Sequence, residues 1–155
     1  MIERDIVQDI ARKYTPEEVK VGMTASHSAL DTCDGAVEEG FRTVAFCQKG
    51  RDSPYSKYFR SKRAADGRLI RGMVDDAVVL DRFMDMMSEE WQSRIKEDNI
   101  VWVPNRSFTS YVDIKEIEEN FAVPMVGSRN MLRSEEREEQ QSYYWLLEKA
   151  GLPFP

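Results

Sequence analysis

Short apolar runs alternate with helical segments along this chain, and this alternation restricts the fold more than any other feature. Residues 19–25 form a run of small and branched apolar side chains, residues 30–39 have helical periodicity closed by Gly40, and residues 41–47 form a second apolar run. A strand, a crossover helix and a second strand make a βαβ unit, whose strands are parallel and whose connection is right-handed. The first 50 residues therefore predict an α/β protein.

Three further strands are predicted downstream, over residues 77–80, 100–104 and 122–126. The run at 100–104 is apolar at nearly every position, which is typical of a strand buried on both faces in a parallel sheet. Because helical segments separate the strands, the sequence predicts a three-layer, Rossmann-like domain with a mainly parallel sheet of about five strands.

The helices are expected on both faces of this sheet. Apolar side chains recur every four residues from Phe83 to Ile95, which predicts one helix with a methionine-rich core face. Residues 53–72 mix basic and aromatic side chains and show neither the helical nor the strand period. We interpret them as a long surface excursion. The remaining expected helical segments are residues 2–14, 15–18, 114–120 and 132–150, the last closed by Gly151.

Composition excludes several classes of function. The chain has 155 residues, of which 41% are hydrophobic, and this supports one domain with a core. Its net charge of −6 argues against a nucleic-acid partner, and no apolar run approaches the roughly 20 residues that span a bilayer, so we expect a cytoplasmic protein without a membrane partner.

Cys33 and Cys47 lack metal or redox spacing and are expected to be buried. His27 is the only histidine, which excludes a metal site of clustered imidazoles.

Ligands of such sheets bind beyond the carboxyl ends of the strands, and three polar loops are expected there. These loops are residues 26–28, 105–109 and 127–129, after the first, fourth and fifth predicted strands. Their hydroxyls and the free N–H groups of the following helices favour a phosphate. The alternative for Ser26 and Ser28 is ordinary helix capping, and both interpretations can hold together.

A fourth polar segment, residues 49–52, follows the second strand and is interpreted either as part of the phosphate or ribose site or as a solvated turn. The predicted ligand-binding residues are Ser26, His27, Ser28, Lys49, Arg51, Asp52, Ser107 and Arg129. No phosphate-binding P-loop, nucleophile elbow or dinucleotide glycine fingerprint is present, which argues against a dehydrogenase or an ordinary nucleotide hydrolase.

These loops resemble those of a known family over nearly the whole chain. The shared motifs are Ser-His-Ser-Ala-Leu at 26–30, Lys-Gly-Arg-Asp at 49–52, Val-Pro at 103–104, Ser-Phe at 107–108 and Val-Pro at 123–124. Together they resemble the N-terminal, pre-ATP-grasp domain of the archaeal formaminoimidazole carboxamide ribonucleotide synthetases, which belong to the ATP-grasp superfamily.

The resemblance implies a ligase of purine biosynthesis that joins formate to aminoimidazole carboxamide ribonucleotide (AICAR), with ATP and magnesium, on the way to inosinate (IMP). It implies that His27 and Ser107 contact the ribonucleotide and that family members form homo-oligomers. By this resemblance, residues 1–150 are the substrate domain and residues 151–155 begin a linker to an ATP-grasp domain, which is absent. ATP and magnesium would then bind elsewhere, in cis or in trans, and the chain alone would not be catalytic.

The sequence departs from the family at one loop, because Arg106 stands where the family commonly has glycine. This leaves open a paralogous ligase that acts on another ribonucleotide. A stand-alone nucleotide-binding or regulatory module and a structural piece that drives assembly are further alternatives. Both a truncated protein and a natural single-domain relative are compatible with the ending.

Overall fold

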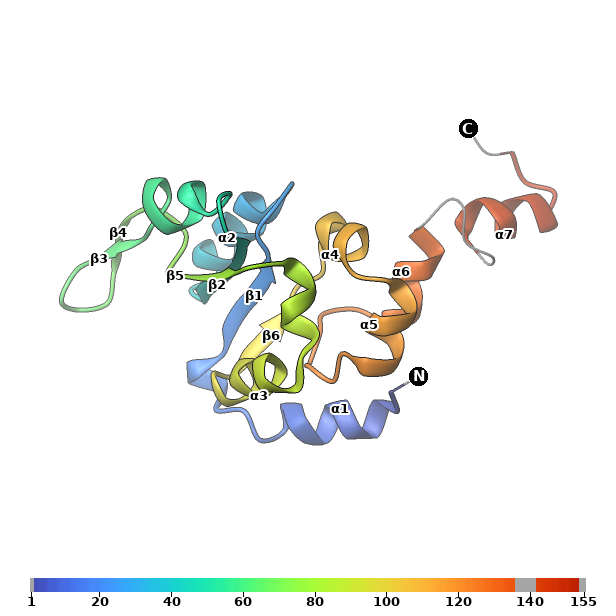
Figure 1. The fold of residues 1–155 in the computed structure, drawn as a ribbon, viewed down its shortest axis with the longest axis horizontal. Helices are drawn as coiled ribbons and strands as arrows, with labels where there is room; N and C mark the ends of the chain where they lie inside the picture. The colour runs from blue at the N-terminus through green and yellow to red at the C-terminus, as the bar shows by residue number, and fades with distance from the viewer. Residues whose placement is uncertain (1, 136–141, 154–155) are drawn as a thin grey trace.

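A four-stranded parallel sheet forms the centre of the protein. The computed structural model describes residues 2–135 and 142–153 (Figure 1). The strand order is β5-β2-β1-β6 and every neighbouring pair is parallel, which confirms the predicted α/β architecture. The strands are β1 (Lys20–Thr24), β2 (Arg42–Gln48), β5 (Asp76–Leu80) and β6 (Ile100–Trp102).

The fifth strand predicted over residues 122–126 is reduced to a single parallel bridge between Trp102 and Met125. Two hydrogen bonds flank this bridge, from the Trp102 N–H to the Pro124 carbonyl at 2.8 Å and from the Val126 N–H to the Trp102 carbonyl at 2.9 Å. Proline has no N–H to donate to a ladder, so Pro124 prevents a longer pairing. Pro104 likewise follows β6, which ends at Trp102 rather than at residue 104.

Helices cover both faces of the sheet and give three layers. Helix α2 (Ala29–Glu38) packs on β1 and β2, whereas the 3₁₀ helix η3 (Phe83–Met87) and α3 (Glu89–Glu97) pack on the opposite face. Successive side chains of β2 alternate between these layers: Val44 and Phe46 belong to the core beneath α3, and Ala45 and Cys47 to the core beneath α2. Both cysteines are buried and free, as predicted.

The helix predicted from Phe83 to Ile95 is interrupted at Ser88. Ser88 has an extended ψ of 150° and its hydroxyl accepts a hydrogen bond from the Trp91 N–H at 3.3 Å, so it ends η3 and caps α3. The break changes the phase of the apolar stripe, and Met86 becomes fully buried in place of Met87. Assignment of the stripe to the core is otherwise confirmed.

The excursion over residues 53–72 has structure of its own. A helical turn, η2 (Pro54–Tyr58), leads into a two-stranded antiparallel hairpin of β3 (Lys62–Arg63) and β4 (Leu69–Arg71). In Figure 1 this hairpin projects from the body of the protein, beyond β5.

Six further helices complete the described part of the fold. They are α1 (Arg4–Ala11), η1 (Pro16–Glu18), α4 (Arg106–Tyr111), α5 (Ile114–Asn120), α6 (Arg129–Glu135) and α7 (Tyr143–Lys149). The predicted final helix is not continuous, because Ser142 is extended and its hydroxyl caps a new helix at Tyr143; residues 136–141 lie outside the described part. Gly151 follows α7 with φ of 66°, the left-handed conformation typical of a helix end. Within the described residues no helix has the length and apolarity to cross a membrane.

Candidate functional site

The strand order places a topological switch point between β1 and β6. The chain moves from β1 to β2 and β5 on one side, and then returns across the sheet to β6 on the other side of β1. Loops leaving adjacent strands at such a point run in opposite directions and leave a crevice at the carboxyl edge. The loops that begin at Ala25 and Val103 follow β1 and β6 at this point, so the fold brings two of the predicted polar loops together.

The first loop carries Ser26, His27 and Ser28 from β1 to α2. His27 has φ of 44°, a left-handed conformation that is uncommon for a residue with a side chain, and its side chain is exposed. Ser28 is the N-cap residue of α2, but its side chain makes no capping hydrogen bond. The capping role considered for Ser28 is therefore not used in this structure, and its exposed hydroxyl is open to a ligand.

The second loop is tied to the first by Asn105. The Asn105 side-chain N–H₂ donates to the Thr24 carbonyl at 2.8 Å and to the Ser26 carbonyl at 3.4 Å. Ser107 follows in the first turn of α4 and is completely buried, so its hydroxyl has no access to solvent. One amide side chain thus joins the two loops.

Three buried polar atoms at this edge have no hydrogen-bond partner: Thr24 Oγ1, Asn105 Oδ1 and Ser107 Oγ. They are three of the five such side-chain atoms in the described part of the chain. A buried polar atom left unpaired costs about 1–3 kcal/mol, and clusters of such atoms require an explanation. Because the Asn105 amide already donates through nitrogen, its free oxygen can only accept a hydrogen bond, and a ligand there must present a donor.

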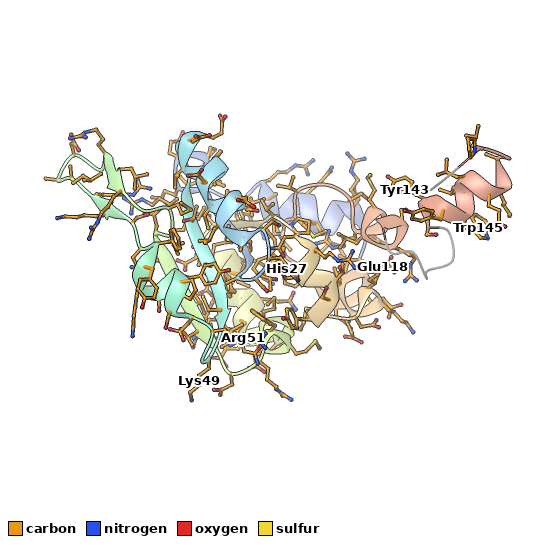
Figure 2. All side chains as sticks on the ribbon, turned by 90° about the horizontal axis from the view of Figure 1, so that it is seen from above. His27, Lys49, Arg51, Glu118, Tyr143 and Trp145 are labelled. Atoms are coloured by element: carbon orange, nitrogen blue, oxygen red, sulfur yellow. The ribbon has the colours of Figure 1, made fainter. Side chains whose placement is uncertain are left out.

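Cationic side chains after β2 lie along the same edge. The Arg51 guanidinium lies 3.2 Å from the Tyr111 hydroxyl, which links this loop to α4. Lys49 pairs with Asp81 at 3.5 Å, but both side chains are more than three-quarters exposed, so the pair is weak. Figure 2 shows His27, Arg51 and Lys49 following one another from the middle of the protein outward.

Asp52 has a local structural role. Its carboxylate accepts a hydrogen bond from the Ser56 hydroxyl at 2.7 Å, and this bond, aided by backbone N–H groups, lowers the pKa of Asp52. The ionised carboxylate thereby stabilises the turn that begins η2.

Arg129 is not brought together with the other predicted residues. Its guanidinium donates to the carbonyls of Phe121 and Val123, and burial lowers its pKa. It lines a separate cleft beside α1 with Ile2 and Arg4. We therefore assign Arg129 a structural role, in which it holds the backbone that pairs with β6.

Sequence reasoning missed Thr24, and it placed Asn105 in a predicted ligand loop without naming it among the ligand-binding residues. Thr24 is a hydroxyl at the last position of an otherwise apolar strand, and Asn105 occupies the N-cap position of α4. Both positions can be recognised in the sequence. The sequence does not show which of their hydrogen-bonding groups stay unpaired in the fold.

The fold and the candidate site define an α/β domain with a cluster of polar side chains at the switch point of a parallel sheet. The model of the family described as "Protein of unknown function (DUF1246)" matches residues 21–155. The chain belongs to this family.

Curated relatives carry a more specific name. The chain is 37% identical to the 5-formaminoimidazole-4-carboxamide-1-(beta)-D-ribofuranosyl 5'-monophosphate synthetase of Methanopyrus kandleri, over 100% of the chain and 39% of the relative. It is 34% identical to the synthetase of the same name from Methanocaldococcus jannaschii, over 100% and 39%. The resemblance found in the sequence is confirmed, and the chain spans about two-fifths of the length of these relatives.

A solved structure supports the same assignment. The IMP biosynthesis protein PurP of Thermococcus kodakaraensis superposes with a TM-score of 0.58 at 27% identity, over 86% of this chain and 37% of that one. The described fold therefore corresponds to part of a larger protein in that structure.

Proposed function

We propose that this chain is the substrate-binding domain of a purine-biosynthesis ligase that forms formyl-AICAR from AICAR and formate, with ATP, toward IMP. The observation that carries the proposal is the match, over the whole of this chain, to relatives named for this product. The switch-point site supports it, because it combines an unpaired acceptor, Asn105 Oδ1, and two unpaired hydroxyls with cations further along the edge.

In this proposal the two ends of the ribonucleotide bind differently. The carboxamide and amine of the imidazole carry N–H donors, which suit the free acceptor of Asn105 and the hydroxyls of Thr24 and Ser107. The phosphate is directed toward the Ser26–Ser28 loop and the cations of Lys49 and Arg51. The exposed His27 lies above this edge, where it can donate to the ribonucleotide or orient its amine for acyl transfer.

ATP and magnesium are assigned to the remaining part of the synthetase, joined in cis or bound in trans. In this proposal residues 1–150 form the substrate domain and residues 151–155 begin the connection to the rest. The chain alone binds the substrate without activating formate.

Calorimetric titration with AICAR, IMP, AMP and ATP tests the proposal. We expect saturable binding of AICAR in preference to ATP, lost in both His27→Ala and Ser107→Ala. Ser110→Ala is the matched control, since this exposed hydroxyl of the same helix donates to the Arg106 carbonyl at 2.9 Å, away from the buried groups. Preferential binding of AMP or ATP would instead favour a stand-alone nucleotide-binding module.

A further inference from the structure

A cleft of about 530 Å³ lies between α1 and the loop that follows the bridge at Met125, and we call it the α1 cleft. This volume is in the range that small-molecule ligands occupy. The start of the chain is fixed beside it, because the Ile2 N–H donates to the Glu118 carbonyl of α5 at 2.9 Å. The switch-point loops at 24–28 and 105–109 do not line the α1 cleft, so it is a separate site.

The polar side chains of the α1 cleft are all hydrogen-bond donors, and among the described residues no carboxylate lines it. The donors are Arg4, Gln8, Ser128 and Arg129. Neither arginine has an ion pair in the part of the chain that the structure describes. On a chain with a net charge of −6, the α1 cleft is therefore a local site of positive potential.

The fold uses only part of the Arg129 guanidinium. Nε and Nη2 donate to the Phe121 carbonyl, and Nη2 donates also to the Val123 carbonyl, whereas Nη1 has no hydrogen bond to a described residue. The side chain is half-buried, and burial lowers the pKa of Arg129 because no anion offsets it. An anion bound at Nη1 would compensate the buried charge.

Gln8 orients the second guanidinium. Its amide oxygen accepts from Arg4 Nε at 2.8 Å and from Arg4 Nη2 at 3.2 Å, which fixes the amide orientation and leaves its nitrogen as a donor. Arg4 and Gln8 are one turn apart on α1, so they share one face of the helix. Forked guanidinium groups bind phosphate and carboxylate oxygens in two-point contacts.

The rest of the α1 cleft is apolar. Ile2, Val7 and Met125 line it beside the donors, and all three are half-buried. Apolar walls next to a few polar groups are typical of sites for small organic molecules. The lining therefore fits a ligand that carries an anionic head on an apolar body.

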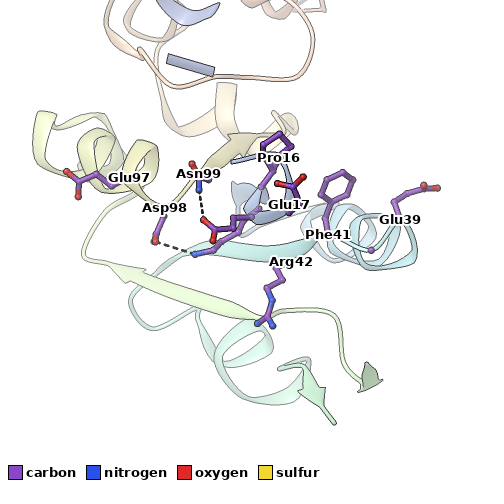
Figure 3. A pocket seen from close by; sticks show the side chains of 12 residues that line it. Pro16, Glu17, Glu39, Phe41, Arg42, Glu97, Asp98 and Asn99 are labelled. Carbon is purple, nitrogen blue, oxygen red and sulfur yellow. Dashed lines mark hydrogen bonds and ion pairs between the residues drawn. The ribbon is translucent and has the colours of Figure 1, made fainter. Parts of the chain in front are cut away.

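The cleft at the amino-terminal edge of the sheet, the amino-edge cleft, lacks this pattern (Figure 3). Its Lys20 is paired with Asp98 at 3.3 Å, and its Glu18 accepts a hydrogen bond from the Asn99 amide at 3.3 Å. Cations and carboxylates line it together, so it does not select an anion.

We propose that the α1 cleft binds a small organic oxyanion, a phosphate monoester or a carboxylate with an apolar body. Arg4 on α1 and Arg129 at the start of α6 hold the anionic head, and the Ser128 hydroxyl donates to it. Val7 and Met125 cover the apolar body. This site is additional to the ribonucleotide site at the switch point.

Amide NMR of the chain titrated with phenyl phosphate, benzoate and phenol tests the proposal. We expect saturable shifts at residues 2–8 and 125–129 with phenyl phosphate or benzoate, and none with phenol, which lacks the charge. The anion that binds more tightly identifies the head group. Arg4→Glu should weaken binding about tenfold or more. Lys13→Glu is the control, because this exposed cation lies just after α1 and does not line the cleft.

A second variant separates the apolar contacts from the charge. Val7→Ser should weaken phenyl phosphate binding about fivefold and leave the affinity for inorganic phosphate unchanged. Phenol that binds as tightly as phenyl phosphate, or Arg4→Glu that binds like the wild type, overturns the proposal. Shifts confined to residues 24–28 and 49–52 also overturn it, as does the lack of saturable shifts at about 10 mM ligand. None of these probes contains an imidazole ribonucleotide, so the result is independent of AICAR binding.

Discussion

Replacing Arg63 by methionine removes the cation from a largely buried ion pair, in which the Arg63 side chain keeps 20% exposure, and keeps most of the side-chain volume. Arg63 Nε and Nη2 lie 2.6 and 2.8 Å from the two Asp75 oxygens, and Nη1 donates to the Gly67 carbonyl at 3.1 Å. The Asp75 side chain is only 7% exposed, so its charge has little access to water. Breaking one side of a buried pair costs about 3–5 kcal/mol. The Thr43 N–H still donates to Asp75, which favours the lower end, about 3 kcal/mol.

Urea denaturation followed by tryptophan fluorescence measures this loss. For a chain of this size, about 3 kcal/mol corresponds to a decrease in melting temperature of about 6–12 °C. Lys62→Met, on the exposed neighbouring residue, should stay within about 0.5 kcal/mol. Adding Asp75→Asn to Arg63→Met should recover part of the loss, because no charge is then left buried. Equal stabilities of Arg63→Met and the wild type would refute the reasoning.

The same pair predicts a pH dependence. Burial alone would raise the pKa of Asp75, but hydrogen bonds from Arg63 and Thr43 outweigh burial and lower it. A carboxyl whose folded pKa is lowered stabilises the fold above its unfolded pKa of about 3.9, and this stability is lost as pH falls through the folded value. The difference between Arg63→Met and the wild type should therefore be full at pH 7 and shrink below about pH 4.

Two further predictions concern the core. Gly22→Ala should destabilise by about 2 kcal/mol or more, because the new Cβ would collide with Ile100 Cγ2 between β1 and β6; chemical denaturation checks this. Cys33 and Cys47 should resist a thiol reagent at pH 8 until urea is added, since burial raises the pKa of each to about 12. Their protonated state stabilises the fold below the unfolded pKa of about 8.5, and this stability is lost as pH rises toward 12; fast labelling of the native chain would contradict the burial.

The layer architecture was predictable because it follows from periodicity, whereas local breaks depend on single residues. The βαβ unit, the parallel sheet and the core stripe were read correctly from apolar spacing. The interruption at Ser88 was missed, although serine before two glutamates is a helix-start signal. Pro124 likewise marked the shortened fifth strand.

The position of the candidate site could be predicted from the sequence, but only some of the residues that line it could be. Parallel strands place their following loops at one edge, which located His27 and Ser107 without a structure. The order of the strands does not determine where a long side chain points. The Arg129 guanidinium donates to backbone carbonyls and does not lie with the other predicted residues. Thr24 and the role proposed for Asn105 were missed because they depend on which hydrogen-bonding atoms the fold leaves unpaired.

Backbone amide NMR of the chain titrated with AICAR shows most directly whether the switch-point edge binds the imidazole ribonucleotide. We expect saturable shifts concentrated at residues 24–28 and 105–108, with smaller shifts at 49–52. Shifts centred on the amino-edge cleft, or no saturable shifts, would contradict it.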